Sequence, residues 1–161
     1  MGIADELLSL SAALIFLDQE HCTQAALRRS VSTAYYAVFH LLISDAAQRW
    51  EGTTADRGGL ERSFSHGGMK SVSLEFAHNR WKDSRGTKPR QPQSLRDVAA
   101  AFVDLQTGRH VADYDNHREW TQTEAADMIG KANGIFEKWQ TIRTAPEAGT
   151  YLLAMLLGKQ R

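Results

Sequence analysis

This chain of 161 residues has one cysteine, three prolines and a formal net charge of zero. Because Cys22 is alone, no disulfide can form within the chain, and we expect a cytoplasmic location. Asp5 and Glu6 occupy positions that are basic in a secretory signal, so we also expect no export signal. Zero net charge gives no overall attraction to nucleic acid, so any such attraction must come from a local cluster of charges.

Long apolar runs and strand patterns are also missing. The longest apolar run, YLLAMLLG at 151–158, is far shorter than the ~20 residues of a membrane-spanning helix, so we expect no membrane contact. No segment alternates apolar and polar residues with the period of two that is typical of a strand. The glycine-rich phosphate loops, nucleophile motifs and paired metal ligands of common enzymes are absent too. We therefore predict neither a cofactor nor a metal.

The sequence instead has apolar residues at helical spacing. This pattern predicts a single domain, residues 1–161, that folds as an all-α, up-and-down helical bundle of four long helices plus short appended helices. Thr23 is the expected N-cap of the second helix, Ser94 with Asp97 forms the expected capping box of the fourth, and Thr121 or Thr123 caps the fifth. The expected helices are 3–21, 24–50, 69–81, 94 to about 105, 121 or 123 to about 139, and the C-terminal packing helix 148–158.

Two stretches between these helices lack periodicity and are predicted to be loops. Residues 51–59 form the first, followed by a helical turn at 60–64, and residues 82–93 form a basic surface loop. Residues 80–96 contain six basic residues and one acidic residue, so the local charge is six minus one, or +5. Such a run is usually a solvated loop, but it can also bind a phosphate backbone. The basic residues are Arg80, Lys82, Arg85, Lys88, Arg90 and Arg96.

The predicted helix 24–50 carries two different faces. One is an apolar stripe that can fill a core, and the other is a polar line made by Arg29, Ser32, Tyr36 and His40 at steps of three, four and four. The polar line is either a set of polar tips that reach solvent or one wall of a binding site.

The segment GRHVADYDNH, 108–117, has more ionisable groups than a connection needs, and the helical periodicity fails there. Arg109 can bind phosphate, His110 can transfer a proton near neutral pH, and Tyr114 can donate a hydrogen bond or be modified. The alternative is an i,i+4 ion pair between Arg109 and Asp113, with Tyr114 packed on the bundle. His66, beside a serine and two glycines, is expected in a flexible loop with a reachable imidazole.

Three blocks of sequence, in this order, resemble the HEPN family (higher eukaryotes and prokaryotes nucleotide-binding). They are RRSVSTAYYAVFHLL at 28–42, FSHGGMK at 64–70 and RHVADYD at 109–115, followed by a helix entered through TxxEA at 121–125. The resemblance covers roughly residues 7–139. It implies a helical bundle that dimerises, and either a metal-independent endoribonuclease or an inactive relative, often a toxin encoded beside a minimal nucleotidyltransferase antitoxin.

The ribonuclease motif of that family is an arginine, a polar residue and a histidine, with four to six residues between arginine and histidine. Arg109 and His110 match its first two positions, but Tyr114 stands where the histidine is expected. Arg62 and His66 have only three residues between them. Two interpretations follow: either His110 or His66 takes the role of the missing histidine, or the protein binds without catalysis.

The resemblance therefore implies a toxin–antitoxin or defence-type homodimer that acts on or binds RNA or a nucleotide, and whether it is a metal-independent endoribonuclease is left open. The alternative is a non-catalytic nucleotide- or partner-binding module that works with a minimal nucleotidyltransferase. A third interpretation is an interaction domain without a ligand. The expected catalytic residues are Arg109, His110, Tyr114 and His66, and the expected ligand-binding residues are Arg29, Tyr36, His40 and Asp113.

Overall fold

The computed structural model describes residues 1–17 and 22–158, which form seven α-helices and no strand. This confirms the prediction of an all-α helical bundle. The helices are α1 (Ile3–Leu14), α2 (Gln24–Gln48), α3 (Thr54–Arg62), α4 (His66–Ala77), α5 (Gln93–Tyr114), α6 (Gln122–Ile142) and α7 (Pro146–Leu157). None of them is long and apolar enough to cross a membrane, as far as the described residues go.

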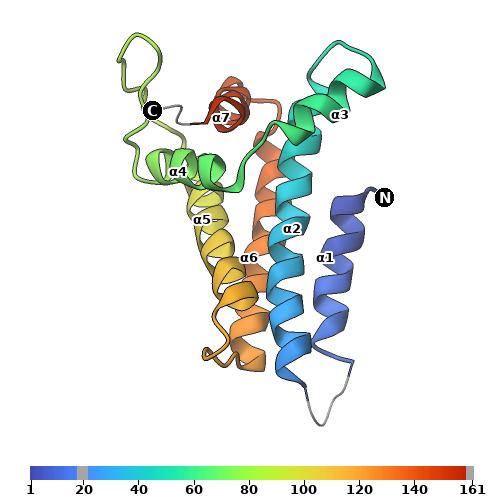
Figure 1. Ribbon diagram of the computed structural model, residues 1–161. Helices are drawn as coiled ribbons and strands as arrows, with labels where there is room; N and C mark the ends of the chain where they lie inside the picture. The colour runs from blue at the N-terminus through green and yellow to red at the C-terminus, as the bar shows by residue number, and fades with distance from the viewer. Residues whose placement is uncertain (18–21, 159–161) are drawn as a thin grey trace.

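Figure 1 shows α1, α2, α5 and α6 side by side along one axis, with α3, α4 and α7 gathered at one end. Along the chain, α1 and α5 run away from that end, and α2 and α6 run toward it. The first helix is shorter than predicted: it ends at Leu14, residues 15–17 are not helical, and 18–21 lie outside the described residues.

The central helix is α2, which contacts α1, α3, α5, α6 and α7. Its N-cap is Thr23, as predicted, because the side chain accepts a hydrogen bond from the backbone N–H of Ala26. Since neighbours surround α2, small polar residues are buried along it as well as apolar ones. Ser30 Oγ, for example, donates to the backbone oxygen of Ser11 at 2.8 Å and joins α2 to α1.

The helices share one hydrophobic cluster. Its buried tyrosines satisfy their hydroxyl groups with nearby polar atoms, as buried polar groups generally do. Tyr151 Oη, for example, lies 2.6 Å from Ser73 Oγ. The largest fully buried side chains include Trp139, Tyr35, Tyr151, Phe76 and Phe102.

Helix α3 covers residues 54–59 of the segment predicted to be a loop at 51–59, so the prediction is wrong there. The end of the helix, 60–62, lies in the helical turn predicted at 60–64. None of its residues is buried, which explains why no apolar period marks it. The signal is a capping box instead: Thr53 Oγ1 accepts from the N–H of Asp56 at 3.2 Å, and Asp56 Oδ2 accepts from the N–H of Thr53 at 2.9 Å.

Helix α4 begins at His66, three residues before the predicted start. Ser65 Oγ accepts from the N–H of Gly68 at 3.1 Å and caps the helix. His66 is therefore the first residue of a helix, and the prediction of a flexible loop around it is wrong.

The predicted loop at 82–93 is non-helical through Pro92, which is the N-cap of α5. The predicted capping box of Ser94 and Asp97 is wrong. Helix α5 has already begun at Gln93, and Asp97 Oδ1 instead accepts from Gln93 Nε2 at 2.8 Å.

Helix α5 continues to Tyr114, well past the point where the apolar pattern fails. Its inward face there holds Gly108, Arg109 and Ala112, all buried at helical spacing. A glycine and a charged residue break an apolar stripe in the sequence without breaking the helix. The helix therefore extends beyond its predicted end near 105, and only residues 115–117 of the segment 108–117 are non-helical.

Candidate functional site

Arg109 projects inward from α5 against the middle of α2 and is only 7% exposed. Its guanidinium carbon lies 5.3 Å from the centre of the Tyr35 ring and 5.9 Å from that of Tyr36. Both distances are in the range of a cation–π contact. Two adjacent aromatic residues of α2 therefore form a surface against which the cation rests.

The hydrogen bonding of this buried cation is incomplete. Nη1 donates to Asp113 Oδ2 at 3.4 Å, which is the i,i+4 ion pair that the sequence allowed, at the long end of such contacts. Nε is buried and has no partner among the described residues. Since buried charges are normally paired and fully hydrogen-bonded, this guanidinium keeps donor capacity that an anion could use.

Gly108 lies where α5 packs closely against α6 and α2. A Cβ there would lie 3.0 Å from Met128 Cε on α6 and 3.5 Å from Val31 Cγ1 on α2. The first distance is tight and the second is an ordinary contact, so a larger residue requires the flexible end of Met128 to shift.

His66 joins the same group from the first turn of α4. Its Nδ1 lies 2.6 Å from Tyr35 Oη, and its ring centre is 4.6 Å from that of Phe39. Burial lowers the pKa of His66, and the positive charge of Arg109 lowers it further. Burial also raises the pKa of Tyr35 above its ordinary value, so phenol and imidazole are both neutral at pH 7.

The Tyr35–His66 pair can hold the imidazole in either tautomer, because a phenol hydroxyl both donates and accepts. When Tyr35 donates to Nδ1, His66 presents an N–H at Nε2. When Nδ1–H donates to Tyr35, Nε2 presents a lone pair instead. The same imidazole can thus donate to a phosphate oxygen or accept a proton from a hydroxyl.

We call Arg109, Asp113, Tyr35, Tyr36 and His66 the Arg109 centre.

Two further buried polar atoms lie on α2 and α5, the helices that also carry Tyr35, Tyr36 and Arg109. Ser32 Oγ, one helical turn from Tyr36, and Gln106 Oε1, one turn before Arg109, have no hydrogen-bond partner within the described part of the chain. Buried polar atoms normally have a partner, so each of these is an exception to the general rule.

The other predicted site residues lie apart from this group. His110 and Tyr114 face away from α2 and contact each other, with ring centres 5.1 Å apart. Tyr114 is 67% exposed, so it is not packed on the bundle as the ion-pair alternative had it. Arg29 is exposed, and His40 lies farther along α2, where burial lowers its pKa and Glu61 acts in the opposite direction.

Of the predicted residues, the structure therefore brings together Arg109, Asp113, Tyr36 and His66. It adds Tyr35, a residue on the apolar side of the helix predicted at 24–50 that was not among the predicted site residues. The sequence could have indicated Tyr35, because a tyrosine on a buried apolar stripe needs a hydrogen-bond partner for its hydroxyl.

The described residues contain no group of three or more histidine, cysteine, aspartate or glutamate side chains placed to hold a metal. Comparisons with models of protein families, with curated proteins and with solved structures find no significant match. The HEPN resemblance thus stays a prediction from the sequence blocks.

Proposed function

We propose that this protein is a HEPN-like ribonuclease that binds RNA at the Arg109 centre and cleaves it without a metal ion. One observation supports this above all others: a buried guanidinium with an unused Nε–H lies beside an imidazole that is neutral at pH 7. An arginine suits a phosphate because its planar donors match the phosphate oxygens. A neutral histidine suits proton transfer near neutral pH.

In the proposed reaction the ribose 2′-oxygen attacks the adjacent phosphorus. Its proton passes to Nε2 of His66, and Arg109 stabilises the negative charge that grows on the phosphate oxygens. The bond from phosphorus to the 5′-oxygen breaks, and that oxygen takes a proton from solvent. The products are a 2′,3′-cyclic phosphate and a 5′-hydroxyl, and His66 is restored when its proton returns to solvent.

The proposal includes a homodimer, because the resemblance to the HEPN family implies a bundle that dimerises. It also includes a minimal nucleotidyltransferase encoded nearby, in a toxin–antitoxin or defence setting. Size measurement of the purified protein tests the first point, and inspection of the neighbouring open reading frames tests the second.

The direct test of the function is RNA cleavage in EDTA by the wild-type protein and by Arg109→Met and His66→Gln. Arg118→Met and His78→Gln are matched controls, because both residues lie outside the Arg109 centre. We expect cleavage by the wild type and by both controls, and loss in the two centre variants. Cleavage that is unchanged in Arg109→Met would remove the proposal.

A second candidate is a nucleotide-binding module without catalysis, which acts with the nucleotidyltransferase partner. The observation that favours it is Tyr114, which stands in the place of the family's histidine and is 67% exposed. This candidate predicts nucleotide binding that requires Arg109, with no cleavage of RNA under any condition. Cleavage that depends on His66 would exclude it.

A further inference from the structure

The chain between α4 and α5 carries a strong local positive charge in a neutral protein. Figure 1 shows it as a loop that extends from the end of the bundle where α4 and α7 lie. All its cations are exposed, and none forms an ion pair with a described residue. They are Arg80, Lys82, Arg85, Lys88 and Arg90.

The single acid of this loop is used to hold the loop itself. Asp83 Oδ1 accepts from the backbone N–H groups of Arg85 at 2.9 Å and Thr87 at 2.8 Å. At the far end, the N–H of Gln91 donates to Asn79 Oδ1 at 2.8 Å and ties the loop to the end of α4. The cations are thus presented on a hydrogen-bonded frame, so less conformational entropy is lost when they bind a ligand.

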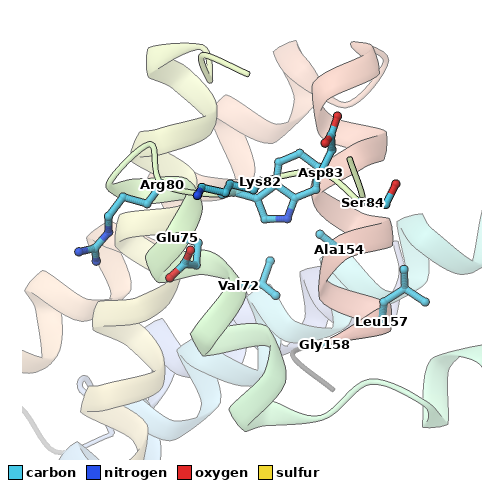
Figure 2. A pocket seen from close by; sticks show the side chains of 10 residues that line it. Val72, Glu75, Arg80, Lys82, Asp83, Ser84, Ala154, Leu157 and Gly158 are labelled. Atoms are coloured by element: carbon cyan, nitrogen blue, oxygen red, sulfur yellow. The ribbon is translucent and has the colours of Figure 1, made fainter. Parts of the chain in front are cut away.

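A cavity of about 690 Å³ lies at the base of the loop, between α4 and α7. Figure 2 shows Arg80 and Lys82 reaching to one side of it and Asp83 and Ser84 on the other. Trp81 also lines the cavity, and its ring is supported from behind by Phe76, with centres 5.0 Å apart. An aromatic ring that is held in place beside cations is a suitable surface for stacking a base.

We propose that residues 80–90, with Trp81, bind single-stranded RNA, with the phosphates on the cations and a base in the cavity against the indole. A groove that combines positive charge and aromatic rings is typical of proteins that bind single strands. The inference rests on the proposed function and extends it. His66 of the Arg109 centre is the first residue of α4, and the basic loop follows the last residue of that helix. The 12 residues of α4 therefore separate the Arg109 centre from the loop by about 18 Å.

The test is binding of a fluorescent 2′-O-methyl RNA, which has no free 2′-hydroxyl and cannot be cleaved, measured by anisotropy at several salt concentrations. The triple variant Arg85→Ala/Lys88→Ala/Arg90→Ala should bind at least about tenfold more weakly and reduce the slope of log affinity against log salt by about 2. The control triple variant Arg57→Ala/Lys131→Ala/Lys138→Ala loses the same charge elsewhere and should keep the wild-type affinity.

Trp81 is tested separately. Trp81→Leu should weaken binding at least about fivefold with little change in the salt slope, whereas Trp81→Phe keeps a ring and should recover most of the affinity. Circular dichroism and thermal unfolding show which variants are folded. If Trp81→Leu fails to fold, the RNA affinities of Trp81→Phe and of the triple variant test the proposal instead.

The outcomes separate this inference from the proposed function. Loop-dependent binding of RNA without any cleavage supports the inference and contradicts the ribonuclease. Cleavage that needs Arg109, with an RNA affinity that no loop substitution changes, overturns the inference alone. Loop-dependent binding to phosphatidylserine vesicles, with no binding to RNA, overturns it in favour of a membrane surface.

Discussion

Two charged side chains are buried at α2, one from the helix itself and one from α5, and their surroundings differ. Asp45, 5% exposed, accepts hydrogen bonds from Trp139 Nε1 and Arg49 Nη2, each at 3.2 Å, and also from Arg143 Nη2. Arg109, 7% exposed, has one hydrogen bond at 3.4 Å, and its Nε has no partner among the described residues. One buried charge is satisfied by the protein, and the other is not.

Under the proposed function, this difference separates a structural role from a functional one. A buried charge with several good partners holds elements together, and loss of that charge leaves those partners unpaired. A buried charge with weak partners contributes little to folding, and its unused donors are available to a ligand. The two sites therefore respond to substitution in opposite ways.

The largest effect is expected at the Arg109 centre. Arg109→Met should reduce the rate of RNA cleavage by at least about 100-fold, because the growing charge on phosphate loses its donor. It should change the free energy of unfolding by less than about 1 kcal/mol, because methionine fills the space and the lost ion pair is weak. Single-turnover cleavage and urea unfolding measure the two quantities. A stability loss as large as that of an Asp45 variant would contradict the distinction.

The reverse pattern is expected at Asp45. Asp45→Ala should lower the free energy of unfolding by about 3 kcal/mol, because it leaves Trp139 Nε1 buried without a partner and two arginines without their carboxylate. RNA cleavage below the unfolding temperature should be retained. Asp104→Ala, which removes an exposed ion pair with Lys131, is the control and should cost less than about 1 kcal/mol.

A smaller effect is expected from the hydroxyl of Tyr35. Tyr35→Phe should lower the free energy of unfolding by about 1 kcal/mol through loss of the hydrogen bond to His66. It should also slow cleavage, because the hydrogen bond that holds the imidazole ring of His66 in place is then lost. Tyr151→Phe removes a hydroxyl that is bonded to Ser73 far from the centre, so it should lower stability and leave cleavage intact. Equal cleavage in both variants would argue against a role for Tyr35.

The smallest effect concerns pH. The pKa of His66 in the folded protein is below its value in the unfolded chain, which is about 6.5. Between these two values the unfolded state binds more protons, so the free energy of unfolding falls as the pH is lowered through this range. The wild-type protein should therefore lose more stability than His66→Gln between pH 7.5 and 5.5, as followed by urea unfolding. An identical pH dependence would show that His66 is not buried beside a cation.

The sequence predicts the bundle because its core helices carry continuous stripes of apolar residues. It misses α3 and the start of α4, where the sequence has no apolar stripe. The N-caps Thr53 and Ser65 mark where these two helices begin. It also misses the last turns of α5, since Arg109 interrupts the apolar pattern while pointing inward. Arg109 and His66 were named as candidates, but their proximity depends on how α4 packs against α5, which no local pattern encodes.

The proposed function requires the unpaired donors of Arg109 to bind a phosphate. The most direct test is the affinity of an uncleavable 2′-O-methyl RNA for the wild-type protein, Arg109→Met and Asp45→Asn, measured where all three are folded. We expect Arg109→Met to bind about 10- to 100-fold more weakly, the equivalent of one charge-assisted contact, and Asp45→Asn to bind like the wild type. Equal affinity of the wild type and Arg109→Met would contradict it.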